Sequence, residues 1–188
     1  AHSTNSTRDV SSLFATTGGQ NWQINTFGSN VTYATPLSGS STLTKLGNGT
    51  LTLTGANTYS GNTTISGGAL QIGGAGTLGA GSYSGTITNN ATLQYSSSTD
   101  QSLSGTLSGT GGLTKDTSSS TLTLSGNNTY TGVTNITTGT VALGSTTALG
   151  ATSMVTFGDN ATLDLKGNSV TLQGIASSYT TSTIKTTG

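Results

Sequence analysis

Residues 43–73 read LTKLGNGTLTLTGANTYSGNTTISGGALQIG, and residues 113–144 read LTKDTSSSTLTLSGNNTYTGVTNITTGTVALG. These stretches are two copies of one pattern. Leu43 aligns with Leu113 at an offset of 70, and later positions align at 71 because the second copy carries one extra residue near Ser118. Self-similarity at a long, fixed period indicates a protein built by stacking equivalent units.

The first copy contains the strict alternation TLTLT at residues 50–54. In a β-strand, successive side chains point to opposite faces, so leucines gather on one face and threonines on the other. Similar short runs, separated by Gly, Asn and Ser, recur along the chain. They predict strands near residues 50–54, 63–66, 69–72, 84–88, 91–95 and 103–107.

The composition favours an all-β fold. Only ten of the 188 residues are charged (five Lys or Arg, five Asp or Glu), whereas 29 are glycine. Such a chain has few strong helix formers. Gly/Ser/Thr-rich sequences are often disordered, but here Leu, Ile and Val recur at period two between turn signals, so they can be buried together.

The same numbers exclude several classes of function. The net charge is zero, which leaves no basic surface for nucleic acid. The chain has no cysteine, so we expect neither disulfides nor thiolate-bound metal. No apolar run approaches the roughly 18 residues of a membrane span. No signal peptide is visible, so the sequence reads as a mature product.

The repeats divide the chain into a polar leader and one domain. The leader, residues 1–17, matches nothing in the repeats. The expected domain covers residues 18–188, with a partial repeat at 18–42, repeat one at 43–112 and repeat two at 113–188. Short strands with long-range self-similarity predict a β-solenoid. With about 23 residues per coil, each repeat makes about three coils and the domain about seven, in a rod ~35 Å long.

A family resemblance strengthens this interpretation. Residues 49–61 and 120–132, with the preceding LSGTGGLTK at 107–115, resemble the autotransporter-associated β-strand repeat, also called the passenger-associated transport repeat. The resemblance covers roughly residues 37–174. It implies a right-handed parallel β-helix on the surface of Gram-negative bacteria, exported as a passenger through an outer-membrane barrel.

Residues for catalysis are scarce. The only histidine, His2, lies in the leader, so no Ser–His or Cys–His pair is expected in the stack. Asp159, Asp164 and Lys166 form the most useful cluster of charges. Repeat one carries neutral polar residues at the equivalent places, so we expect solvated surface positions and no catalytic residues.

Other ligand signatures are incomplete. The glycine run at 73–78 lacks the aspartate of calcium-binding β-rolls, so neither a metal nor a cofactor is expected. Thr-x-Thr pairs suit ice binding only if they recur on every coil. Tyr59 and Tyr130 share one turn position, where packing across a corner is favoured over a ligand platform. Trp22 and Phe27 are expected to cap the first coil.

The leading hypothesis is a non-enzymatic extracellular structural protein that stacks head to tail with itself into a cell-surface fibre. Val10, Leu13 and Phe14 of the leader are predicted to enter a neighbour's groove as an added strand. The alternative is an autotransporter passenger fragment, acting as a stalk or as an adhesin toward a host surface or glycans. More remote alternatives are a glycan-active β-helix enzyme and an ice-binding protein.

Overall fold

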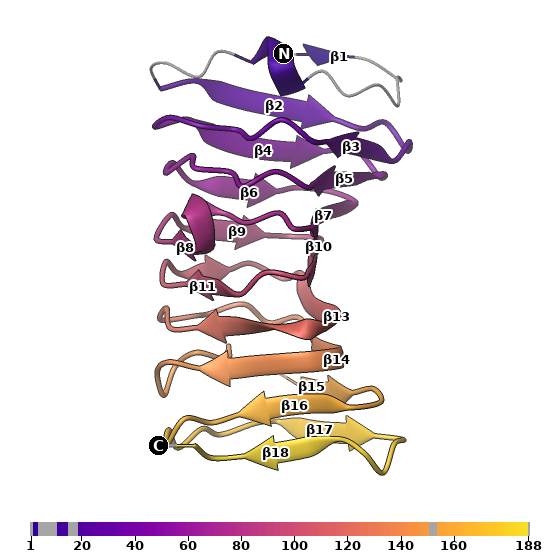
Figure 1. The fold of residues 1–188 in the computed structure, drawn as a ribbon, viewed down its shortest axis with the longest axis vertical. Helices are drawn as coiled ribbons and strands as arrows, with labels where there is room; N and C mark the ends of the chain where they lie inside the picture. Colours follow the sequence, from indigo (N-terminus) through magenta and orange to yellow (C-terminus); the bar gives the residue numbers. More distant parts are fainter. Residues whose placement is uncertain (1, 4–10, 15–18, 151–153, 188) are drawn as a thin grey trace.

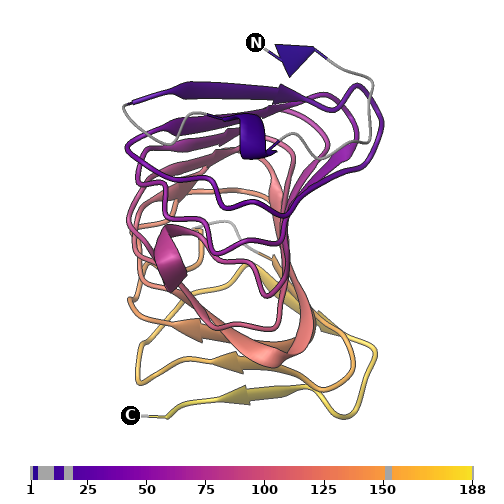
Figure 2. The same ribbon diagram turned by 45° about the horizontal axis from the view of Figure 1, so that its top comes forward.

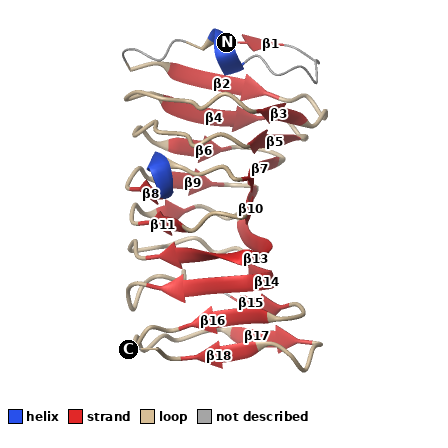
Figure 3. Cartoon of the chain, in the orientation of Figure 1, coloured by secondary structure: helices blue, strands red, loops and turns tan. Residues whose placement is uncertain are grey.

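The computed structural model describes residues 2–3, 11–14, 19–150 and 154–187. This part of the chain is almost wholly strand and turn, with two short 3-10 helices, η1 (Ser11–Leu13) and η2 (Gly79–Gly81) (Figure 3). The prediction of an all-β fold is confirmed.

The strands follow one another in short steps. In chain order they are β1 (His2–Ser3), β2 (Asn21–Asn25), β3 (Val31–Tyr33), β4 (Thr42–Leu46), β5 (Thr50–Leu53), β6 (Thr63–Ile65), β7 (Ala69–Gly74), β8 (Ser82–Tyr83), β9 (Ile87–Asn89), β10 (Thr92–Ser97), β11 (Gln101–Leu103), β12 (Leu107–Ser108), β13 (Gly112–Leu124), β14 (Thr134–Leu143), β15 (Met154–Phe157), β16 (Ala161–Asp164), β17 (Gly174–Ser177) and β18 (Thr183–Lys185). Most of the strands expected in repeat one are present, but the run expected at 103–107 is divided between β11 and β12.

Every strand pairing is parallel, and the turns of the chain stack along one axis, with the two ends of the chain at opposite ends of the stack (Figure 1). The strands form three sides. Side one contains β1, β2, β4, β6, β9 and β12. Side two contains β3, β5, β7, β10, β15, β17 and the first parts of β13 and β14. Side three contains β8, β11, β16, β18 and the last parts of β13 and β14. In the tilted view of Figure 2 these sides enclose a common interior.

Each side carries a column of inward-facing residues in register. The column of side one is Trp22, Leu43, Thr63, Ile87 and Leu107. That of side two is Val31, Leu51, Leu70, Leu93, Leu113, Thr134, Val155 and Ile175. That of side three is Gln101, Leu122, Val141, Leu163 and Ile184.

These columns make one continuous core. Leu43, Leu51 and Leu122 are each 0 % exposed, as the alternation predicts. Burial of one such side chain contributes roughly 1.5–3 kcal/mol. Because every turn shares its core with the turns on both sides, stability accumulates along the stack.

The length of a turn differs from the expectation. Register partners in successive turns lie 19 residues apart for Leu51 and Leu70 and 24 apart for Thr63 and Ile87. Along side two, six of the seven spacings are shorter than the predicted 23 residues. The column of side two passes through about eight turns, where about seven were expected. The right-handed sense stays a prediction of the resemblance.

The repeat is also not a whole number of turns. Three turns along side one lead from Leu43 to Leu107, and the repeat equivalent of Leu43, Leu113, lies six residues further on, on side two. In the same way Leu51 lies on side two and its equivalent Leu122 on side three. Each repeat therefore covers three turns and one additional side.

Candidate functional site

The repeated turn, NTYSG at 57–61 and NTYTG at 128–132, is built around an asparagine that ties three turns together. The Asn57 Oδ1 accepts a hydrogen bond from the Leu37 backbone N–H at 2.9 Å, and its Nδ2 donates to the Thr77 carbonyl at 3.0 Å. Asn128 makes the same pair of bonds in repeat two, at 2.7 and 2.5 Å. Both side chains are buried, so the amide satisfies backbone groups that water cannot reach.

The tyrosine of the motif points inward. Tyr59 and Tyr130 are both 0 % exposed, which confirms packing across the corner and rules out a surface platform for a ligand. The Tyr59 hydroxyl bonds to the Thr63 hydroxyl at 2.8 Å, and Thr63 bonds to Tyr83 at the same distance. The Tyr130 hydroxyl bonds to Thr134 at 2.6 Å. Burial raises the pKa of Tyr59 well above its usual value.

The closing glycine is required by space. A Cβ built on Gly61 would lie 2.3 Å from the Ser41 carbonyl oxygen, and one on Gly132 would lie 2.2 Å from that of Gly111. The backbones of adjacent turns touch here, so any side chain would push them apart. The motif therefore encodes a structural corner.

Aromatic rings extend from this corner to the first turn. The Tyr59 ring lies 5.9 Å from Trp22, and Trp22 lies 5.9 Å from Phe14, which also contacts Tyr33 at 5.6 Å. Trp22 is thus part of the core at the N-terminal end. The expectation that Phe27 helps to cap the first coil is wrong: Phe27 is 50 % exposed in a turn with a φ of 53°.

The predicted assembly residues fall in different places. Val10 lies outside the described residues. Leu13 is 78 % exposed, whereas Phe14 is half-buried against its own chain. β1 also pairs with β2 of the same chain. Exchange of the leader between subunits stays a prediction, and Phe14 would have to leave Trp22 to take part in it.

Lys45 is 0 % exposed, and sequence reasoning missed it. Its ammonium donates hydrogen bonds to the carbonyls of Leu46, Gly47 and Gly67, at 2.9, 2.8 and 3.0 Å. Burial lowers the pKa of Lys45 to about 8. The side chain closes the corner between sides one and two by satisfying carbonyls from two successive turns.

Lys115, the repeat equivalent, has the same burial with fewer partners. Its ammonium donates to the Thr117 carbonyl and lies 5.9 Å from the centre of the Tyr95 ring. Burial lowers its pKa to about 8, against the opposing effects of Asp116 and Asp100. A signal for both lysines was present in the sequence: in Leu-Thr-Lys, the lysine shares the strand face of the buried leucine.

The cluster of charges in the last turns is structural, and the expectation that Asp164 is solvated is wrong. Asp164 is 4 % exposed. Its carboxylate accepts hydrogen bonds from the Thr187 hydroxyl at 2.7 Å and the Lys166 N–H at 3.0 Å, and lies 3.8 Å from the Lys185 ammonium. The Thr187 bond is the first cause of a lowered pKa for Asp164.

Asp159 lies at the other end of β16 and is exposed. It accepts a hydrogen bond from the Thr181 hydroxyl. Asp159 and Asp164 therefore flank β16 and hold the segment that carries β18, so the structure uses the pair to fasten the final turn.

The described residues were also compared with three other kinds of site: a metal site, a membrane-spanning helix and a Thr-x-Thr face. No group of three or more His, Cys, Asp or Glu residues in the described ranges is placed to hold a metal ion. Within those ranges, no helix has the length and apolar character to cross a membrane. The pair Thr50 and Thr52 is followed in the next turn by Ala69 and Gln71, so the Thr-x-Thr pattern does not continue up the face.

The comparison with family models agrees with the repeated motif. The passenger-associated-transport-repeat model matches residues 43–72 and 116–143. These ranges contain both copies of the corner, and the predicted resemblance is confirmed there. Comparisons with curated proteins and with solved structures gave no match.

Proposed function

Because the chain contains two passenger-associated transport repeats in one parallel β-solenoid, we propose that it is a non-enzymatic, extracellular rod of the autotransporter passenger type. The observation that supports this most strongly is the use of the repeated residues. Asn57 and Lys45 donate hydrogen bonds to neighbouring turns of the stack, and the Tyr59 ring packs against Trp22 and Tyr83 of other turns. The repeat builds length, and the rod serves as a stalk.

Hydrogen bonds and ion pairs within the protein engage Lys45 and Asp164, and this supports a non-enzymatic role. The Lys45 ammonium is engaged by carbonyls, and the Asp164 carboxylate by hydroxyl, N–H and ammonium donors. A group so engaged is poorly placed to exchange protons with a substrate. A hydrolytic activity on glycans that is present in the wild type and lost in Asp164→Asn would overturn this.

Export tests the passenger assignment. The chain is placed between a secretion signal and an outer-membrane translocation domain in a Gram-negative host. We expect the rod on intact cells, detected by antibody and by cleavage with external protease. The matched controls are Leu122→Asp, which disrupts the core, and Thr123→Asp, which faces outward on the same strand. Retention of the wild type inside the cell, with normal export of the translocation domain alone, would contradict the proposal.

A second candidate function, a fibre of stacked copies, is favoured by the last turn. Among the described residues, β17 pairs only with β15 and β18 only with β16, and Ile175 and Ile184 are 53 and 46 % exposed. With Phe157 they line an opening of about 150 Å³. Exposed apolar edge strands favour pairing with another chain, and the occupant proposed here is a second copy.

Light scattering after size-exclusion chromatography tests the fibre. We expect concentration-dependent oligomers that Ile184→Lys dissolves and that Thr114→Lys, on an outward position of side two, leaves intact. A monomer at every concentration would contradict the fibre and leave the stalk proposal untouched.

A further inference from the structure

The outward face of side one is a regular array of polar side chains, most of them hydroxyls. Its central row follows the strand register from β2 to β12 and consists of Gln23, Thr44, Thr64, Thr88 and Ser108. A second row lies two residues earlier on each turn and consists of Asn21, Thr42, Asn62, Thr86 and Thr106. The Thr-x-Thr arrangement that stops after one turn on side two therefore continues from turn to turn on side one, with Asn or Ser at single places.

This array is in register and carries no charge. The pairings from β2 to β12 run without a shift in register, and the strands lie directly above one another in Figure 1. By contrast, β13 carries a bulge between Lys115 and Thr121. Neither row contains a charged or aromatic residue. Because threonine is stiff at χ1, the strands hold its hydroxyls in fixed directions.

The central hydroxyls are available to an external partner. Thr44, Thr64 and Thr88 are partly exposed, and their hydroxyls make no hydrogen bond with the described residues. On side two, the outward Thr52 hydroxyl donates to Gln71 at 2.8 Å, and Gln71 donates to Ser96 at 2.8 Å. Side two thus satisfies outward polar groups within its own sheet, whereas side one leaves the donor and acceptor capacity of its central hydroxyls unused.

The spacing of the hydroxyls indicates what that partner is. Equivalent residues of neighbouring strands lie ~4.8 Å apart, and residues two apart on one strand lie ~6.7 Å apart. In ice each water is bonded tetrahedrally, so with O···O distances of ~2.75 Å two waters that share a neighbour lie ~4.5 Å apart. The misfit of ~0.3 Å per turn is smaller than the ~0.5 Å range of ordinary O–H···O distances. Along the strand the array is only two positions wide, so a misfit in that direction does not accumulate.

We propose that side one binds ice, with the central hydroxyls taking the places of waters in the lattice at a crystal face. A charged ligand would find no opposite charge on this face, and a single sugar ring would find no aromatic platform. A rigid, periodic set of neutral hydroxyls fits a partner that is itself periodic. The other periodic partner is a crystalline polysaccharide, and the experiment separates the two.

Thermal hysteresis, the gap between the melting and freezing points of a single ice crystal, tests the proposal on the whole chain. We expect the wild type to open such a gap and to inhibit ice recrystallisation. Thr64→Lys places a long, charged side chain in the middle of the central row and should raise the concentration needed for inhibition at least about tenfold. Thr114→Lys, the same change on the outward face of side two, should leave that concentration unchanged.

Two further measurements keep the outcome clear. Urea unfolding reports whether the variants are folded, and Thr88→Lys repeats the test one turn further along the row. Cosedimentation with microcrystalline cellulose measures binding to a polysaccharide lattice. No hysteresis with the wild type, an equal loss in Thr114→Lys, or binding to cellulose without an effect on ice would overturn the proposal. The result does not depend on where the rod is located or on whether it forms fibres.

Discussion

Repeats one and two share a motif and place it on different sides of the solenoid. Leu51 packs in the column of side two, and its equivalent Leu122 packs in the column of side three. The local geometry around each is nevertheless alike: both are fully buried, and both asparagine–tyrosine corners make the same bonds. The unit that the sequence repeats is therefore a strand–corner–strand element, which fits any side of the stack.

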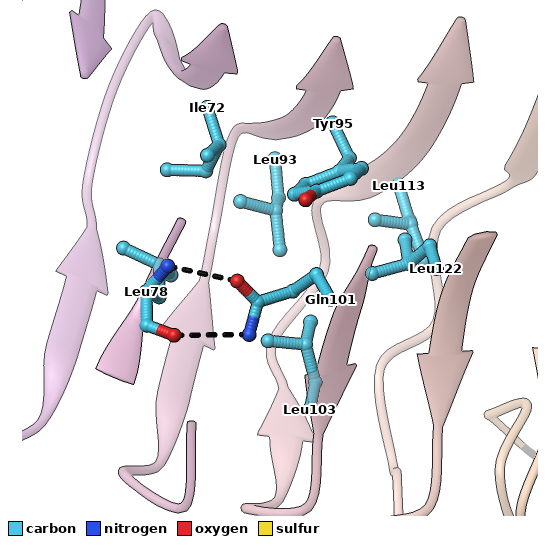
Figure 4. A pocket seen from close by; sticks show the side chains of 8 residues that line it. All are labelled: Ile72, Leu78, Leu93, Tyr95, Gln101, Leu103, Leu113 and Leu122. Atoms are coloured by element: carbon cyan, nitrogen blue, oxygen red, sulfur yellow. Dashed lines mark hydrogen bonds between the residues drawn. The ribbon is translucent and has the colours of Figure 1, made fainter. Parts of the chain in front are cut away.

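The two copies differ in the hydrogen bonds that connect them to other segments of the chain. In repeat one, Gln101 makes two hydrogen bonds with the backbone of Leu78 (Figure 4), whereas no side chain among the described residues makes such bonds with Leu149. Lys45 binds three carbonyls, but Lys115 donates to one. Repeat two therefore has fewer hydrogen bonds at these positions. Substitutions at equivalent residues of the two repeats can measure the resulting difference in stability.

The largest effect is expected in the shared core. Leu51→Ala and Leu122→Ala should each lower the free energy of unfolding by about 2–5 kcal/mol, because each removes a fully buried side chain. Denaturant unfolding gives both values. Thr123→Ala, on the outward face of β13, should change it by less than about 0.5 kcal/mol. A negligible loss for Leu122→Ala alone would show that side three is not a packed core.

The buried lysines should differ from one another. Lys45→Met removes three hydrogen bonds from a charged donor to backbone carbonyls and should cost about 1.5–3 kcal/mol. Lys115→Met removes one hydrogen bond and a contact with the Tyr95 ring, for which about 1–2 kcal/mol is expected. Urea unfolding of the two variants side by side makes the comparison, and the reverse order would contradict it.

The same lysines predict a dependence on pH. Burial lowers the pKa of each to about 8 in the folded chain, whereas an unfolded lysine titrates near ~10.4. Between these values the unfolded chain binds more protons, so the free energy of unfolding should rise with pH across this window. Urea midpoints at pH 7 and pH 9 test this. The increase should vanish when both lysines are replaced by methionine.

Loss of the tyrosine hydroxyls should cost less stability than loss of the lysines, and here the residue of repeat two should cost more than the residue of repeat one. Tyr130→Phe removes a bond to the Thr134 hydroxyl, and about 1–1.5 kcal/mol is expected. Tyr59→Phe should cost less, about 0.5–1 kcal/mol, because Thr63 keeps its bond to Tyr83. Thermal or urea unfolding measures both changes. A larger cost for Tyr59→Phe would show that the chain of three hydroxyls acts cooperatively.

The smallest effect is local and confined to the last turn of repeat two. Hydrogen bonds from Thr187 and Lys166 lower the pKa of Asp164 below its ordinary value, so its stabilising contribution is present at neutral pH and is lost as pH falls through the folded pKa. Amide exchange of Thr183–Lys185 should accelerate in acid, while that of Thr63–Ile65 should not. Asp164→Asn should exchange fast at every pH.

Much of the fold follows from period-two patterning. The alternation at 50–54 correctly gives the buried leucines, and the repeat correctly gives a stack. The side of the solenoid on which each repeat begins was not predictable in this way. It depends on turn length, and turn length depends on how closely corners such as Gly61 pack on the backbone of the adjacent turn. Three turns along side one end at Leu107, six residues before the start of the next repeat at Leu113, and this remainder produces the change of side.

Gln101 illustrates a second limit. It is an ordinary polar residue in a polar chain, and its role arises from contact with Leu78, 23 residues earlier in the sequence. Lys45 was overlooked for another reason: composition places lysine at the surface, whereas its strand parity and the nearby carbonyls place it inside.

The one-side advance of each repeat has a geometric consequence for any longer array of such units. A feature carried once per repeat would reappear about a third of a revolution further around the axis each time. It would return to its starting direction after three repeats. Decorations would be distributed evenly around the rod, so it could engage ligands from every direction while its interior stayed the same.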